Sequence, residues 1–454
     1  MEVPRRSGRS PSGARSGRRG WPSCASLALT TAVLLAPGLS CAQPDQAQPM
    51  AGPASSPASL STFTLEQVLA LAEAANPVLQ GKQAQLAAAE GAVTDAVALF
   101  QNNPQVSIES TRRKVPDASS LERRKEWSAG VSQTFEISGQ PGHRRQASAA
   151  ALQALRLEID DMRLQQRAEV AQRFYRVLAF QRRVELETQA VRMFDETARA
   201  VEKRRAAGED TRLDANVALV EAERARNQLA TVQEQLIEAR SALAVPLQLP
   251  PSGLPEVAGA LEAARLPYSE GELLDLAQTQ PRLRALASRQ DSASARLQLE
   301  RAARYPDVTV GLNVGREGAM DARERLTTLT VSLPLPLFKR NAAGIGVAAT
   351  EAAQADIERR AAARNVPADI HALWVRLQSM QQRVDRLQLS VMPTLAKNEE
   401  LSKKSLHAGQ IGLMELILTN RQLIDARRDL VEALLDYQTT RLNLEAAAGW
   451  TVQP

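Results

Sequence analysis

The sequence contains few of the residues on which much protein chemistry depends. Of its 454 residues, two are cysteine, three are histidine and 3% are aromatic. Cys24 and Cys41 both lie near the N-terminus, so the remainder offers no disulfide framework and no thiol chemistry. His143, His371 and His407 lack the paired spacing of a zinc site. We therefore predict no bound metal and no cofactor, and we expect His371 to be a packing residue on its helix.

An excess of charge of one sign is also missing once the N-terminus is set aside. Residues 1–42 hold six of the 56 Lys and Arg residues and one of the 51 Asp and Glu residues, which leaves 50 of each. The formal net charge of +5 is thus no argument for binding nucleic acid, and no nucleic-acid partner is expected. There is no nucleophile–base pairing, phosphate loop or metal cluster, which predicts that the protein is not an enzyme.

The apolar run from Ala25 to Ala36 is too short to cross a bilayer as a helix, which needs ~20 apolar residues. It follows an arginine-rich stretch and precedes Ser40-Cys41-Ala42, which has the small-x-small pattern of a cleavage site. Residues 1–42 are therefore predicted to be a secretory signal peptide, and residues 43–61, rich in Pro, Ala, Ser and Gln, a disordered leader. The alternative is that Cys41 becomes the first mature residue and carries a lipid.

The chain does have a long internal repeat. Residues from about Phe63 to Val245 recur, diverged, from about Tyr268 to Gly449. A repeat of this length indicates two copies of one architectural unit rather than a stack of short repeats. Structural repeats are predicted at 62–245 and 268–450, with a Pro/Gly-rich linker at 246–267 and a tail at 451–454. Matching pairs are Pro77 with Pro281, Phe174 with Trp374, Gly208 with Gly409, Asp214 with Glu415, and Leu243 with Leu444.

Each copy contains a predicted hairpin of long helices. The segment from His143 to Ala207 has neither Gly nor Pro and would be about 95 Å long as one helix, at 1.5 Å per residue. Helices in globular domains average ~11–12 residues, so this length indicates a coiled coil or a helical tube. Returning helices are expected at 213–245 and 413–448. The alternative is an ordinary helical hairpin in a soluble bundle.

Four other segments alternate between apolar and polar residues with period two. The polar stretches 114–126 and 316–325 are expected to be loops that join these strands into two hairpins. Such alternation is typical of membrane β-barrel strands, although a half-buried strand of a soluble sheet has the same pattern. Trp127 and Phe135 are expected at a membrane interface or in a buried β-contact. The apolar positions include Val106, Ile108, Val131, Val308, Val310, Leu312, Leu329, Val331, Leu333 and Leu335.

Four strands cannot close a barrel in lipid, because open edges leave backbone groups unpaired and the smallest barrels need about eight strands. Several chains would have to pool their strands, and three chains would give twelve. The sequence thus predicts a mainly α fold with a small β part, in which long helices form a tube beneath a shared barrel.

With these features in view, the chain resembles the TolC-type outer-membrane factors, and within them the CzcC-like branch that serves heavy-metal efflux. The resemblance extends from about Thr64 to Gly449. The motifs that carry it are Asn76-Pro77, Asn103 to Ser107, Val131 to Gly139, Tyr305-Pro306-Asp307, and Ser332 to Asn341.

The resemblance implies a homotrimer in the outer membrane of a Gram-negative bacterium, with a 12-stranded barrel in outer-membrane lipid and helices in the periplasm. Its partners would be a periplasmic adaptor (a membrane fusion protein) and an inner-membrane RND pump, and its cargo cations of the cobalt, zinc and cadmium class. The alternatives are the same duct serving multidrug efflux or type I secretion, and a periplasmic coiled-coil adaptor or scaffold.

The turns of the two helical hairpins are the candidate sites. Gly208 is suited to ending a helix, and the spacing of Thr211 and Asp214 matches a capping box. The residues expected to dock the adaptor are Arg204, Gly208, Thr211, Leu213, Lys404, Leu406, Gly409, Gly412 and Leu413, with an exposed Leu at each tip. Repeated by threefold symmetry, Asp210, Asp214 and Glu415 would form an acidic ring at the pore mouth, or else remain solvated surface charges.

Overall fold

The structure is a computed structural model that describes residues 62–116, 121–250, 253–318, 323–408 and 410–450. The predicted signal peptide, leader and tail, with Cys41 and Gly409, lie outside the described residues.

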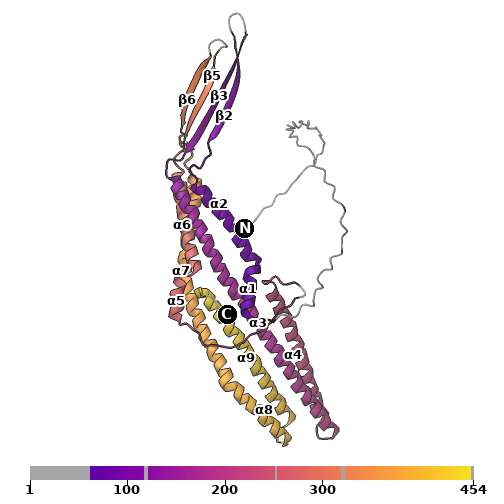
Figure 1. Cartoon of the computed structure of the whole chain (residues 1–454). Helices are drawn as coiled ribbons and strands as arrows, with labels where there is room; N and C mark the ends of the chain where they lie inside the picture. The colour runs from indigo at the N-terminus through magenta and orange to yellow at the C-terminus, as the bar shows by residue number, and fades with distance from the viewer. Residues whose placement is uncertain (1–61, 117–120, 251–252, 319–322, 409, 451–454) are drawn as a thin grey trace, which may run out of the picture. The chain divides into compact units, whose positions relative to one another are not determined.

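The same order of elements occurs twice (Figure 1). The first set is α1 (Leu65–Ala75), α2 (Pro77–Val97), β2 (Gln105–Pro116), β3 (Leu121–Phe135), α3 (Gln140–Ala206) and α4 (Arg212–Ala244). The second is α5 (Glu270–Gln278), α6 (Pro281–Ala302), β5 (Val308–Glu317), β6 (Glu324–Ser332), α7 (Ala342–Arg386), the π-helix η1 (Leu387–Val391), α8 (Met392–His407) and α9 (Leu413–Ala448). The short strands β1 (Thr62–Phe63) and β4 (Glu256–Val257) pair in parallel.

The prediction of one very long helix is confirmed by α3, which runs for 67 residues without interruption. Its counterpart in the second set is broken by η1, where the Met392 N–H donates to the Leu387 carbonyl. Pro393 follows directly, and a proline inside a helix has no N–H to donate and its ring collides with the preceding turn. A single π-turn accommodates this conflict. None of the described helices is both long and apolar enough to cross a membrane.

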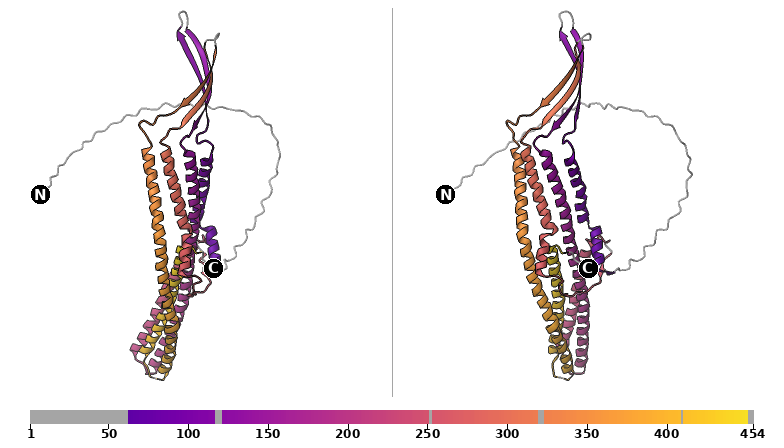
Figure 2. Two further views of the ribbon diagram at one scale, coloured as in Figure 1. Left: turned by 90° about the vertical axis from the view of Figure 1, so that its left-hand side faces the viewer. Right: turned by 60° about the vertical axis from the view of Figure 1, so that its left-hand side comes forward.

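The long helices lie side by side as a wall (Figure 2). Near the sheet the neighbours run α2, α3, α6, α7, and near the hairpin turns they run α4, α3, α9, α8. Small side chains such as Ala154, Ala293 and Ala355 are buried along the upper helices, which permits close approach. The two largest apolar clusters lie at mid-height, one around Phe174 and one around Tyr437.

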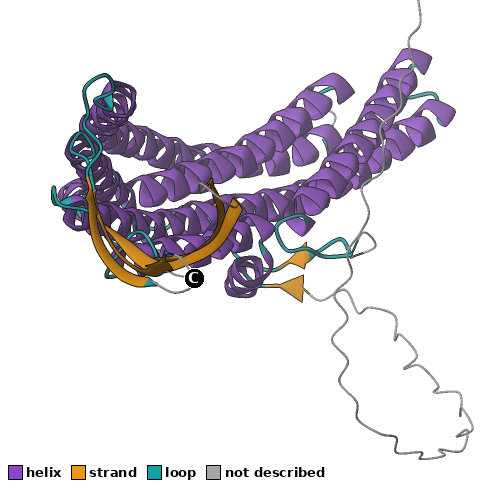
Figure 3. Ribbon diagram, turned by 90° about the horizontal axis from the view of Figure 1, so that it is seen from above, coloured by secondary structure: helices purple, strands orange, loops and turns teal. Residues whose placement is uncertain are grey.

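The four long strands form one antiparallel sheet in the order β2-β3-β5-β6. Figure 3 shows it curled when viewed along the helices. Within the described residues β2 and β6 each pair along one side only, so both outer edges of the sheet are open. Every residue of β6 is exposed in the single chain.

The strand ends differ from the sequence prediction. The presumed loop 114–126 is mostly strand, because β2 continues to Pro116 and β3 begins at Leu121. The ladder is held by backbone groups, so a run of charged side chains does not end it. Conversely β6 stops at Ser332, and Leu333 and Leu335 lie beyond it among prolines, which cannot donate to a ladder.

Candidate functional site

The first hairpin tip, residues 204–214, is fixed by its own backbone. Gly208 has a φ of +83°, a left-handed value that suits glycine. The Glu209 N–H donates to the Arg204 carbonyl at 2.9 Å and the Gly208 N–H to the Arg205 carbonyl at 3.0 Å, which together form a Schellman motif. As a result, α3 ends in a sharp, rigid turn.

A capping box then starts α4. The Asp214 N–H donates to the Thr211 hydroxyl oxygen at 3.1 Å, and the Thr211 N–H donates to the Asp214 carboxylate at 3.1 Å. The Thr211 hydroxyl also donates to that carboxylate, and these bonds lower the pKa of Asp214. The predicted capping box is thus confirmed.

The second tip, residues 404–415, forms the same kind of turn with fewer hydrogen bonds. The Gln410 N–H donates to the Ser405 carbonyl at 2.8 Å, as Glu209 does to Arg204. The Gly412 N–H donates to the Glu415 carboxylate at 3.1 Å. Glycine has no hydroxyl to return the bond, so only half of a capping box forms.

The two tips differ in which apolar side chain they expose. Leu213 is 71% exposed, as predicted, but Leu413 is partly buried against the cluster that contains Ile417. The prediction of an exposed Leu at each tip is therefore wrong for Leu413. Met414, one residue further along α9, is exposed instead, because one step turns a helical residue by about 100°. Leu406 at the same tip is half-buried.

Charged side chains at the tips have local partners. The Arg204 Nε lies 3.1 Å from an Asp210 carboxylate oxygen and 3.5 Å from one of Glu209. Lys404 pairs with Glu400 one turn earlier in α8. Of the three residues predicted to form an acidic ring, Asp214 and Glu415 cap helices and Asp210 pairs with Arg204, and the ring itself stays a prediction.

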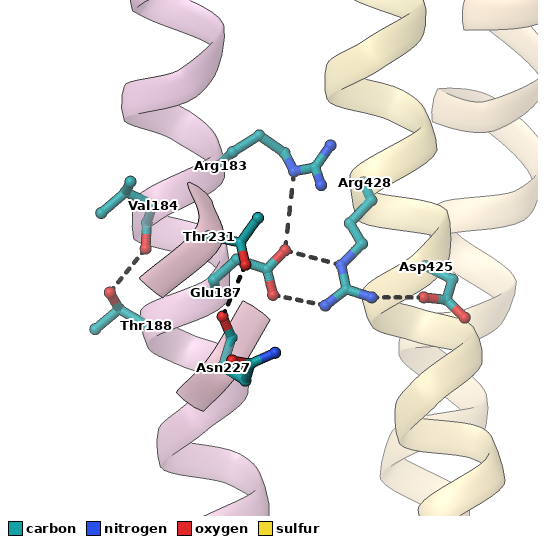
Figure 4. A network of polar contacts seen from close by, with 8 residues as sticks. All are labelled: Arg183, Val184, Glu187, Thr188, Asn227, Thr231, Asp425 and Arg428. Atoms are coloured by element: carbon teal, nitrogen blue, oxygen red, sulfur yellow. Dashed lines mark hydrogen bonds and ion pairs between the residues drawn. The ribbon is translucent and has the colours of Figure 1, made fainter. Parts of the chain in front are cut away.

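Buried ion pairs, which the sequence analysis missed, join the two hairpins above the tips. Glu187 of α3 is fully buried, and Arg428 of α9 donates to both of its oxygens, at 2.8 and 2.6 Å (Figure 4). Asp425 accepts from the same guanidinium at 2.9 Å, and Arg183 lies 3.8 Å from Glu187. The bonds to Glu187 raise the pKa of Arg428.

A second pair lies one heptad towards the tips. Arg421 of α9 binds Glu221 of α4 through two nitrogens, with its Nε 2.7 Å from one oxygen. The Glu221 side chain is only 8% exposed. Between the two pairs pack Phe194, Ala225 and Ile424. The spacing of Arg421 and Arg428 was visible in the sequence, but their partners, 200 and 241 residues away, were not.

One face of the sheet is polar and lines a hollow of about 530 Å³. Side chains there are small or hydrophilic, as at Ser107, Ser128 and Asn313. Asn313 covers Gly130 so closely that a Cβ at that glycine would lie 1.6 Å from its Oδ1. The opposite face carries exposed apolar residues such as Ile108 and Leu329. The predicted alternation along the strands is thus confirmed.

The described residues contain no group of three or more His, Cys, Asp or Glu side chains placed to hold a metal ion. His371 is not the packing residue that we expected. Its side chain is 68% exposed, and its Nδ1 lies 2.7 Å from a Glu270 oxygen. It lies one residue after the buried Ile370, and this step of about 100° around α7 carries it to the exposed side, so the apolar neighbours in sequence misled the prediction.

Comparison with known proteins agrees with this architecture. The family model of the outer membrane efflux protein matches residues 68–247 and 273–450, and the chain belongs to that family. It is 25% identical over 365 residues to the cobalt-zinc-cadmium resistance protein CzcC of Cupriavidus metallidurans, covering 80% of this chain and 85% of that protein. It is 27% identical over 293 residues to the pyoverdine export outer membrane protein OpmQ of Pseudomonas putida, covering 61% and 62%.

Among solved structures, CusC, described for the folding and formation of a transmembrane channel, superposes with a TM-score of 0.71 at 17% identity. The match covers 85% of this chain and 92% of CusC. The resemblance to TolC-type factors is therefore confirmed. The protein is an outer-membrane efflux channel of tripartite systems, with a helical extension into the periplasm, and it is not an enzyme. Channels of this family are trimers.

Proposed function

We propose that three copies of this chain form one duct through the outer membrane, which exports heavy-metal cations of the cobalt, zinc and cadmium class. The observation that supports a shared duct is the pair of open sheet edges, β2 and β6, on opposite sides of one chain's sheet. Unpaired backbone groups cost several kcal/mol each in hydrocarbon, so each edge needs a neighbouring strand. Pairing β6 of one copy with β2 of the next satisfies both edges and closes twelve strands.

The two hairpin tips form the proposed docking surface for the periplasmic partner. Docking onto a periplasmic adaptor, coupled to an inner-membrane RND pump, would involve Leu213 and Met414 as exposed apolar contacts. The rigid Schellman turn and capping box present Leu213 at little cost in conformational entropy. We assign the predicted docking residues Arg204, Gly208, Thr211, Lys404, Leu406, Gly409, Gly412 and Leu413 to the same surface, Leu413 as internal support.

The cargo is inferred from the similarity to CzcC, whose name specifies resistance to cobalt, zinc and cadmium. The similarity to OpmQ, named for pyoverdine export, supports the second candidate, a duct for organic compounds. A wide polar duct discriminates weakly between metal cations and organic compounds, because the cargo is selected in the pump. The adaptor or scaffold alternative does not survive the family assignment.

Deletion of the gene tests the proposal. We expect tolerance of cobalt, zinc and cadmium salts to fall at least about fourfold, with plasmid-borne wild type restoring it and drug tolerance unchanged. Loss of tolerance to antibiotics or loss of siderophore export, with metal tolerance intact, would replace cation export by the second candidate.

A further inference from the structure

The apolar face of the sheet ends in a band of basic and aromatic side chains at the edge farthest from the helices. The strand register places Ser110, Trp127, Arg316 and Arg325 side by side across β2, β3, β5 and β6. Arg112 and Lys125 are paired two residues further along. Paired residues share a face and alternate residues return to it, so these positions continue the apolar face. We call Arg112, Lys125, Trp127, Arg316 and Arg325 the basic band.

Charge is sorted between the two faces at this end of the sheet. The polar face carries four glutamates at the same height, Glu109, Glu126, Glu317 and Glu324. Arg113 also lies on the polar face, 3.5 Å from Glu126. On the apolar face the four cations of the basic band form no ion pair with any described residue. A solvated surface usually mixes both signs, so four unpaired cations beside an apolar surface call for an external anion.

The height of the band on the sheet matches a membrane surface. The ladder between β3 and β5 starts at Phe135–Val308 and reaches Trp127–Arg316 eight residues later. Both end pairs included, this is nine ladder positions, and a tilted barrel strand crosses a bilayer in ~9–11 residues. Phe100 and Phe135, in edge-to-face contact at 5.4 Å, lie at the lower limit of this stretch. Trp127 lies at its upper limit, where indole rings concentrate.

We propose that the basic band binds the phosphate groups of anionic lipid in the membrane leaflet distal to the helices. Arginine matches phosphate geometry with two parallel N–H donors, and three of the four cations are arginines. Their positions on three different strands would let one lipid with two phosphates bridge neighbouring strands. The proposal rests on the outer-membrane location of the sheet and is independent of the cargo.

Native mass spectrometry of the full-length protein in detergent tests this, with lipid A carrying two phosphates and its monophosphoryl form as probes. The two probes share sugar and acyl chains, so a difference reports phosphate alone. We expect wild type to retain the bisphosphorylated form about tenfold better, because its second phosphate gives the cations of the basic band a further anion to bind. Equal retention of the two forms would overturn the proposal.

The triple variant Arg112→Gln, Arg316→Gln, Arg325→Gln is expected to lose this preference. Arg113→Gln is the matched control, since it removes one cation from the opposite face of the same strand, and it is expected to keep the preference. Loss in both proteins, or in neither, would contradict the assignment. Should the triple variant fail to assemble, Arg316→Gln and Arg325→Gln alone are each expected to lose about threefold, and no loss in either would contradict it.

Discussion

At the scale of single residues, the buried carboxylate of Glu187 depends on one partner more than on any other. Arg428 supplies two hydrogen bonds to it from another helix, whereas Arg183 approaches only to 3.8 Å. Removing one member of a buried pair leaves an uncompensated charge, and the cost is typically 3–5 kcal/mol. This contact is therefore expected to hold the two hairpins together more firmly than any exposed pair.

Arg428→Ala is predicted to destabilise the helical wall by about 3 kcal/mol, a figure at the lower end of that range because the arginine is partly exposed. Thermal unfolding followed by helical circular dichroism measures the loss. Arg182→Ala, which breaks an exposed pair with Glu185, is the control and is expected to cost less than about 1 kcal/mol. Equal thermal unfolding midpoints for both variants would show that the buried pair stabilises the protein no more than the exposed pair does.

Asp214 and Glu415 allow a test of the acidic ring that leaves the helix caps intact. Asp214→Asn with Glu415→Gln removes two charges per chain but keeps the carbonyl oxygens that accept from Thr211 and Gly412. If the ring exists, cation-over-anion permeability in planar bilayers is predicted to fall at least about twofold. Glu209→Gln, next to the tip glycine, is the control, and an unchanged ratio in the double variant would dismiss the ring.

At the scale of elements, the first tip should lose its partner when its exposed apolar contact is removed. Leu213→Asp is predicted to reduce cross-linking to the periplasmic adaptor by at least about fivefold, since a charge in the centre of an apolar contact must be desolvated. Ile237→Asp, on the same helix but far from the tip, is likewise exposed in the single chain and serves as the control. Equal capture of both variants, with both still trimeric, would remove the tip from the docking surface.

The strand pair β3–β5 contains a close approach that glycine alone allows. A Cβ on Gly315 would lie 2.9 Å from the Trp127 carbonyl oxygen, which is backbone and cannot swing aside. Gly315→Ala is therefore predicted to lower the temperature at which the assembly dissociates in SDS. Gly81→Ala in α2 meets nothing within 4 Å and is predicted to stabilise its helix by about 0.5–1 kcal/mol. A Gly315→Ala protein as heat-resistant as wild type would contradict the packing described.

At the scale of the whole molecule, the sequence was most informative where one local rule governs a long segment. The absence of Gly and Pro between His143 and Ala207 predicted α3, and Gly208 with Thr211 and Asp214 predicted the first tip. Strand alternation predicted the two faces of the sheet. In each case the pattern repeats with the period of the backbone, so a single sequence suffices.

Prediction failed where the outcome depends on groups distant in sequence or on the backbone alone. The pairing of Glu187 with Arg428 is set by how α9 packs on α3. The strands continue through the charged stretch 114–126 because their ladder bonds do not involve side chains. Leu413 is partly buried because the second hairpin packs against the first, and the sequence of α9 alone does not show that contact.

The central claim is that the open edges of one chain are completed by its neighbours. Ile108→Cys in β2 and Leu329→Cys in β6 place thiols on exposed apolar-face positions near opposite edges of one chain's sheet. Three strand spacings and two residues of register separate them, which is about 16 Å along the sheet. A bis-maleimide of about 8 Å cannot span that distance, but it can join adjacent strands of two copies. The claim predicts covalent dimers and trimers in membranes from the double variant and none from either single variant. A double variant that reacts fully with maleimide yet runs only as monomer would contradict it.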